Sequence, residues 1–180
     1  MQSKSVRFLA PMALFGITAC TAPPAETDLT RVGDLAVAMK GAQTFGLHPN
    51  ARYVNPRPGD FAFDIRSSMD GAISKVFTDA GYSITEHSRA DRVIAYAIGT
   101  HEHMRDKSVQ KFFGITPKPD VRPSTFRGAL VIAILDPHSN VVFRGTASRP
   151  VQEAPMRDAE RQRKRILKAV SDLLVDLPQR

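Results

Sequence analysis

The chain has one cysteine, Cys20, among its 180 residues. A single cysteine excludes an intramolecular disulfide, so the fold must be held together by packing alone. Tryptophan is absent and aromatic residues make up only 7% of the chain, which argues against a binding surface built from aromatic platforms. Beyond the N-terminal segment the chain lacks a long apolar run, so we expect no second membrane span.

The N-terminal segment has the pattern of an export signal. A short basic stretch precedes an apolar stretch over residues 8–19, which is too short to span a bilayer as a helix. The segment Ile17-Thr18-Ala19-Cys20 places a branched residue and two small residues before a thiol, as in bacterial lipoprotein signals. We therefore predict a signal peptide over residues 1–19, cleavage between Ala19 and Cys20, and lipid attachment (diacylglycerol and palmitate) at Cys20. The alternative is an ordinary secretory signal with a chance cysteine.

The remaining chain has the length and charge of one exported domain. The formal net charge is +7, and removal of residues 1–19 takes away Lys4 and Arg7, leaving +5. A modest basic excess suits a surface of anionic lipid or glycan, and we expect no nucleic-acid partner in the cell envelope. By similarity to bacterial lipoproteins, Thr21 in place of Asp after the cysteine favours the outer membrane, facing the periplasm.

Hydrophobic periodicity predicts an α+β fold. Two amphipathic helices are expected, over residues 64–80 and 157–177, because apolar residues recur at spacings of three and four. Alternating patterns predict strands over residues 82–86, 92–104, 125–136 and 141–149, the last two as a hairpin. Weaker apolar runs at 35–39 and 42–45 suggest further strands, and 49–59 and 105–124 suggest loops. These elements predict a two-layer sandwich, with a mainly antiparallel sheet and two helices packed on one face. We divide the chain into a signal peptide (1–19), a tether (20–32) and a single domain (33–180).

Several short motifs occur in an order that resembles a known family. They are Gly81-Tyr82, Asp91 before an apolar strand, Arg127-Gly128-Ala129-Leu130-Val131-Ile132, Val141-Val142-Phe143-Arg144-Gly145-Thr146-Ala147, and a C-terminal helix that ends at Leu177-Pro178. Together they resemble the domain-of-unknown-function 4136 family of bacterial lipoproteins. Phe143 stands where that family often has Trp. The resemblance implies a class and a location, and it carries no enzymatic activity over to this chain.

Two histidines form the best candidate for a metal site. His101 and His103 lie two apart on a predicted strand, so both side chains project from one face, and His87 or His48 is a candidate third ligand. A His-x-His pair without a placed third ligand is a weak zinc signal, and two exposed residues at a strand end are the favoured explanation. We therefore predict neither a metal nor a cofactor, and a metal-dependent envelope enzyme built on His101 and His103 remains the alternative.

Two other segments are candidate interaction sites. One is a basic run on the last helix that includes Arg161, Lys164, Arg165 and Lys168, suited to anionic envelope lipid, although a solvated helix face explains it too. The other is Phe112-Phe113, which either contacts a membrane or another envelope protein, or folds back onto the sheet edge. The sequence thus predicts an outer-membrane-anchored periplasmic lipoprotein that is a non-enzymatic binding or structural module.

Overall fold

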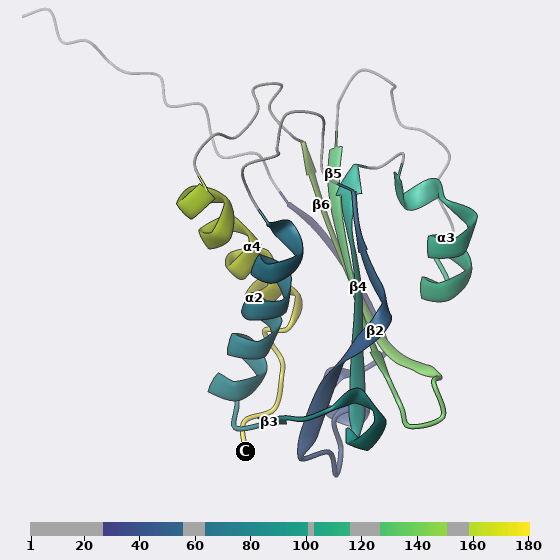
Figure 1. Cartoon of the computed structure of the whole chain (residues 1–180), viewed down its shortest axis with the longest axis vertical. Helices are drawn as coiled ribbons and strands as arrows, with labels where there is room; N and C mark the ends of the chain where they lie inside the picture. The colour runs from purple at the N-terminus through teal and green to yellow at the C-terminus, as the bar shows by residue number, and fades with distance from the viewer. Residues whose placement is uncertain (1–26, 56–63, 101–102, 116–126, 151–158) are drawn as a thin grey trace, which may run out of the picture.

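The computed structural model describes residues 27–55, 64–100, 103–115, 127–150 and 159–180, which form an α+β fold. Within these ranges six strands and four α-helices occur (Figure 1). In chain order they are β1 (Asp28–Val32), α1 (Leu35–Ala38), β2 (Thr44–Val54), α2 (Ile65–Asp79), β3 (Ser83–Ile84), β4 (Arg92–Thr100), α3 (Lys107–Phe113), β5 (Arg127–Leu135), β6 (Val141–Pro150) and α4 (Ala159–Leu173). Both predicted helices and the predicted hairpin are therefore present, but α4 ends at Leu173, four residues before the predicted end at 177, and residues 157–158 lie outside the described ranges.

The strands form one mixed sheet in the order β1-β6-β5-β4-β2-β3. The pairs β1–β6, β6–β5 and β5–β4 are antiparallel, whereas β2 runs parallel to both of its neighbours, β4 and β3. A parallel pair requires a crossover, and α2 supplies it between β2 and the two strands that follow. The sheet is therefore less uniformly antiparallel than the sequence suggested.

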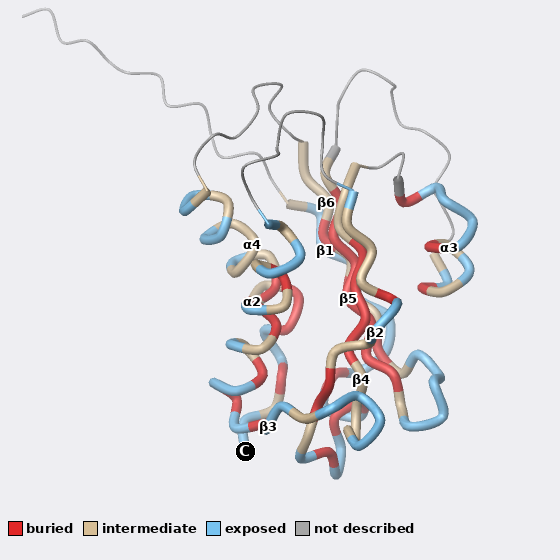
Figure 2. The backbone as a smooth tube through the Cα atoms, in the orientation of Figure 1, coloured by how far each residue is buried: buried red, intermediate tan, exposed pale blue. Residues whose placement is uncertain are grey.

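The helices cover both faces of the sheet. In Figure 1, α2 and α4 lie together on one face and α3 lies on the other. The alternation along β4 explains this arrangement: Ile94 and Tyr96 face the core under α2 and α4, while Ala95 and Ala97 face the smaller core under α3. Figure 2 shows the buried stretches that run along the central strands.

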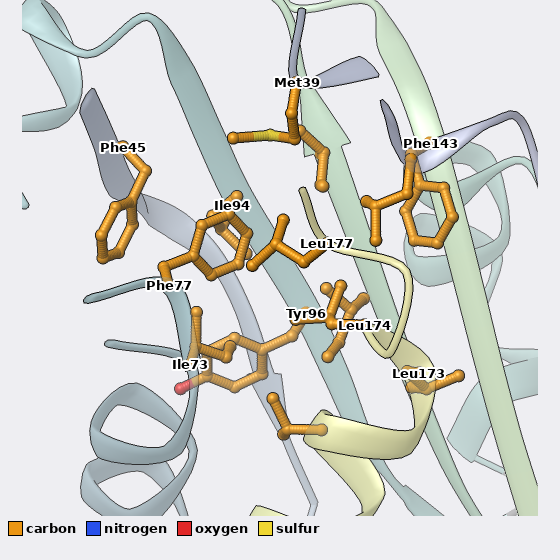
Figure 3. Packing of buried hydrophobic residues seen from close by; sticks show 14 of the residues in the cluster. Met39, Phe45, Ile73, Phe77, Ile94, Tyr96, Phe143, Leu173, Leu174 and Leu177 are labelled. Carbon is orange, nitrogen blue, oxygen red and sulfur yellow. The ribbon is translucent and has the colours of Figure 1, made fainter. Parts of the chain in front are cut away.

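The larger core lies between α2, α4 and the sheet. Phe77 of α2 packs against Phe45 of β2 with ring centroids 4.8 Å apart. Figure 3 shows part of the same cluster, in which Leu173, Leu174 and Leu177, at and after the end of α4, are buried together with Tyr96. Asp64 caps the start of α2 by accepting a hydrogen bond from the Ser67 amide at 3.0 Å, as its sequence position predicted.

Several of the local predictions were wrong. The strand predicted over residues 92–104 is shorter, because β4 ends at Thr100 and His103–Arg105 form a 3-10 turn, so His103 does not lie on a strand. Residues 35–39 were predicted to be a strand, but Asp34 accepts a hydrogen bond from the Val37 amide and so caps the short helix α1. Residues 105–124 were predicted to be a loop, but α3 forms within them, with Asp106 as its N-cap and Gly114 in the left-handed conformation at its end.

The other two corrections concern β2 and β1. The predicted loop at 49–59 overlaps β2, because the pairing with β4 shifts register between Leu47 and Arg52 and leaves Pro49, which has no N–H to donate, out of the ladder. The predicted tether at 20–32 overlaps β1, which pairs with β6 from Asp28 onwards. All five β1 residues are exposed, so the strand carries no alternation that sequence reasoning could detect.

Candidate interaction surfaces

The chain brings the start of its first strand and the end of its last strand to the same end of the sheet. Asp28 of β1 is paired with Ser148 of β6, and Arg149 is paired with Gly128 of β5, which is in turn paired with Thr100 of β4. Both α2 and α4 begin at this end (Figure 1). We call it the tether end, because the residues that precede β1 enter the sheet here.

The basic run predicted from the sequence lies in α4, on its surface. Its residues are Arg161, Arg163, Lys164, Arg165 and Lys168, and all but Arg165 are exposed. The two lysines are ion-paired along the helix: Lys164 Nζ lies 2.7 Å from Glu160, and Lys168 Nζ lies 2.8 Å from Asp172. Exposed i,i+4 pairs contribute only a few tenths of a kcal/mol, about 0.3–0.5, so these lysines remain available to other partners.

Three arginines from two elements gather at the tether end. Arg149 stands near the end of β6, and Arg161 and Arg165 lie one turn apart on α4. Partial burial, followed by the charges of Arg149 and Arg161, lowers the pKa of Arg165 from its usual range. We refer to Arg149, Arg161 and Arg165 as the arginine cluster. The sequence predicted the two α4 residues but missed Arg149, since nothing in a linear reading places the end of β6 beside α4.

An open groove of about 410 Å³ runs between α2 and α4. Its walls carry charges of both signs, with hydroxyls and a small apolar floor. The lining residues are Asp64, Ser67, Ser68, Gly71, Ala72, Lys75, Glu160, Arg163, Lys164 and Leu167. The mixture of acids and bases gives the groove no clear preference for an anionic or a cationic ligand.

The two phenylalanines of α3 have different environments. Phe113 is fully buried in the smaller core, and Arg144 of β6 donates a hydrogen bond at 2.7 Å to its carbonyl oxygen. Phe112 is partly buried and makes edge contacts with the rings of His48 and Tyr53. Of the two alternatives predicted for this segment, Phe113 follows the second, because α3 folds back onto the sheet and buries this side chain, whereas Phe112 stays partly exposed.

The histidines do not form a metal centre in the described part of the chain. His101 lies outside the described residues, and His103 begins a short 3-10 turn. Among the residues that the structure describes, His, Cys, Asp and Glu nowhere gather in a group of three suited to a metal ion. The Nδ1 atom of His48 accepts hydrogen bonds from the amides of Asn50 and Ala51, so this ring stabilises the irregular part of β2.

A partly buried polar network that sequence reasoning missed joins α2 to the sheet. The Tyr96 hydroxyl donates to Asp70 Oδ1 at 2.7 Å, and Arg52 Nη1 donates to Asp70 Oδ2 at 2.7 Å. Burial, followed by the hydrogen bond to Asp70, raises the pKa of Tyr96 far above its ordinary value. The pairing of Arg52 with Asp70 depends on the irregular register of β2, for which the sequence offers no signal.

Asp91 forms a second polar junction, between the starts of β2 and β4. One carboxylate oxygen accepts from the Gln43 amide at 2.8 Å and from the amide and hydroxyl of Thr44, both at 2.9 Å. These hydrogen bonds lower the pKa of Asp91. Its place at the head of a strand is the feature that the family resemblance singled out, and the structure gives it a role in holding two strands together.

The lipid-attachment prediction lies outside the described residues, since both Ala19 and Cys20 precede residue 27. Among the described helices, none combines the length and the apolar character that a bilayer crossing requires.

Comparison with known proteins places the chain within a family. Two solved structures of PelC from Paraburkholderia phytofirmans, both described as dodecamers, are similar over 86% of this chain and 99% of theirs, at 12% identity and TM-scores of 0.52 and 0.50. A PDZ domain protein from Parabacteroides distasonis is similar over 86% of this chain and 35% of its own, at 13% identity and a TM-score of 0.48. No curated protein matches. A family model described as Domain of unknown function (DUF4136) matches residues 34–179, and because this is most of the chain, the protein belongs to that family.

Proposed function

We propose that the protein is a lipoprotein of the outer membrane, facing the periplasm, whose domain is a non-enzymatic binding or structural module. The observation that carries this proposal is the N-terminal pattern: the lone cysteine of the chain ends an apolar segment directly after two small residues. The acyl chains on Cys20 would hold the domain at the membrane, since two or more chains anchor stably where one does not.

The chemistry of the described residues supports a structural role for the domain. Three of the titratable groups with shifted pKa values serve hydrogen bonds that join elements: Asp91 ties β2 to β4, Tyr96 ties α2 to β4, and Asp136 closes the β5–β6 turn. We further infer that the helical layer of α2 and α4 on the sheet is the two-layer framework of the domain, and that α3 is an addition on the opposite face.

Self-association is a second candidate role, favoured by the exposed edge strand β1. Among the described residues no strand lies beyond it in the sheet, and Leu29 and Val32 are 44% and 50% exposed. Such edges invite pairing with another chain. PelC structures of the same fold are described as dodecamers, and light scattering of the purified protein tests whether this chain also assembles.

Palmitate labelling tests the anchor in cells. The wild-type protein is expected to incorporate labelled palmitate and to fractionate with the outer membrane, whereas Cys20→Ser is expected to lose the label and to keep residues 1–19. Thr21→Ser, which leaves the predicted cleavage site intact, is the matched control and should behave as wild type. A wild-type protein that takes up no palmitate, or a Cys20→Ser variant that still does, would show that the anchor is absent or lies elsewhere.

A further inference from the structure

The tether end lies close to the predicted anchor, and this step rests on the proposed function. Seven residues, 21–27, separate Cys20 from the first residue of β1. A fully extended chain spans at most about 3.5 Å per residue, so Asp28 lies within about 28 Å of the anchored residue. The opposite end of the sheet lies roughly the length of a strand from the tether end, about 30 Å for the nine residues of β5.

Among the described residues, the tether end carries an excess of positive charge on its α4 side. The cationic residues in this described part are the arginine cluster, Arg163 and Lys164, and the carboxylates are those of Asp28, Asp64 and Glu160. Arginine is suited to phosphate because its planar guanidinium donates two parallel hydrogen bonds to neighbouring phosphate oxygens. The lipid-proximal end of the domain thus presents phosphate-binding side chains from both α4 and β6.

We propose that the arginine cluster docks the tether end of the domain onto the phosphate headgroups of the anionic membrane in which the lipid on Cys20 is anchored. The lipid supplies attachment, and the cluster fixes orientation, with α4 and the end of β6 toward the headgroups and the β5–β6 turn away from them. Charge complementarity selects this partner, since a mixed-charge or neutral surface would gain little from an excess of arginines.

Vesicle binding without the lipid anchor tests this docking separately. The tested protein consists of residues 20–180 with Cys20→Ser, and it retains every described residue. The probes are vesicles of phosphatidylcholine alone or with 30% phosphatidylglycerol. We expect binding to the anionic vesicles only, weakened as salt rises from 50 to 500 mM because exposed charges are screened. Each basic side chain near an anionic surface strengthens binding about fivefold, so Arg161→Gln/Arg165→Gln should lower the partition coefficient about 25-fold.

The matched control is Lys40→Gln/Arg89→Gln, which removes the same charge from exposed sites outside the tether end. It should change the partition coefficient less than threefold. Equal losses in the two double variants would show a response to net charge alone, and salt-independent binding, or equal binding to neutral vesicles, would also overturn the docking. These outcomes are independent of the palmitate result, because the tested chain carries no lipid in either case.

The orientation of the bound domain is measured with a label at a single site. Because Cys20→Ser leaves the chain without cysteine, a cysteine introduced elsewhere is labelled alone. A fluorophore sensitive to polarity is attached through Arg163→Cys on α4 or through Arg89→Cys outside the tether end. On anionic vesicles the label at position 163 is expected to shift to the blue, and the label at 89 to remain as in water. The reverse pattern, or equal shifts at both positions, would contradict the proposed orientation.

Discussion

Removal of one hydroxyl from the core tests the polar network between α2 and β4. Tyr96 is completely buried, and its hydroxyl donates at 2.7 Å to Asp70, which Arg52 holds from the other side. Tyr96→Phe keeps the ring and its packing and deletes that hydrogen bond, together with the longer one of 3.3 Å to the Arg66 carbonyl oxygen. A hydrogen bond to a charged acceptor contributes about 1.5–3 kcal/mol. Because Asp70 retains Arg52, we expect the lower value, a loss of about 1.5 kcal/mol in the free energy of unfolding at pH 7.

The same substitution should change how stability depends on alkaline pH. The pKa of Tyr96 is raised in the folded protein, so above the ordinary value of 10.0 the unfolded chain loses this proton while the folded protein keeps it. The contribution of the protonated Tyr96 to the free energy of unfolding is therefore complete below pH 10. Above pH 10 this contribution falls by about 1.4 kcal/mol per pH unit. Phenylalanine cannot ionise, so the advantage of the wild-type protein over Tyr96→Phe should fall from about 1.5 kcal/mol at pH 7 to near zero at pH 11.

Urea unfolding of both proteins at pH 7, 9, 10 and 11 measures this difference directly. All other titrating groups are common to the two chains, so their effects cancel in the comparison. A difference that stays constant between pH 7 and pH 11 would refute the assignment of a buried, protonated Tyr96. A variant that is as stable as the wild-type protein at pH 7 would show that the hydrogen bond to Asp70 contributes nothing.

Further predictions concern the second junction, α3 and the histidines. Asp91→Ala should lower the free energy of unfolding by about 2 kcal/mol at pH 7. Because folding lowers the pKa of Asp91, this loss should shrink as the pH falls below 4. Urea unfolding of both proteins at pH 3 and pH 7 checks this. Phe113→Ala should cost about 3–5 kcal/mol, and Phe112→Ala clearly less because that ring is half-buried; equal costs would show that α3 is not packed as described. Elemental analysis of the purified protein is expected to find no stoichiometric metal, and a metal that is lost in His101→Ala/His103→Ala would establish the alternative metal-dependent function.

The sequence predicted those elements in which buried residues recur at a regular spacing. The stripes of α2 and α4 and the alternation of Ile94, Ala95, Tyr96 and Ala97 in β4 correspond to real faces, because each is packed on at least one side. Signals for α3 were also present, since Asp106 and Gly114 bracket apolar residues at helical spacing. The segment was nevertheless predicted to be a loop, because it is short and is followed by a stretch rich in proline and lysine.

The missed features depend on contacts between distant residues. β1 is exposed along its whole length and is defined only by its pairing with β6, so its own composition does not predict a strand. The ion pair of Arg52 with Asp70 requires the extra residues that β2 accommodates after Leu47. No local pattern encodes either feature, since each is decided by which segment of the chain lies next to which.

Topology also fixes where the basic run lies relative to the predicted anchor. β1 pairs antiparallel with β6, so the beginning of β1 and the end of β6 share one end of the sheet. α4 follows β6 in the sequence and starts at that same end (Figure 1). Any lipid attached a few residues before β1 is thereby brought to the end where Arg161 and Arg165 begin α4. A helix that followed an even number of further strands would begin at this end too, whereas one extra antiparallel strand after β6 would place the arginines at the opposite end of the sheet.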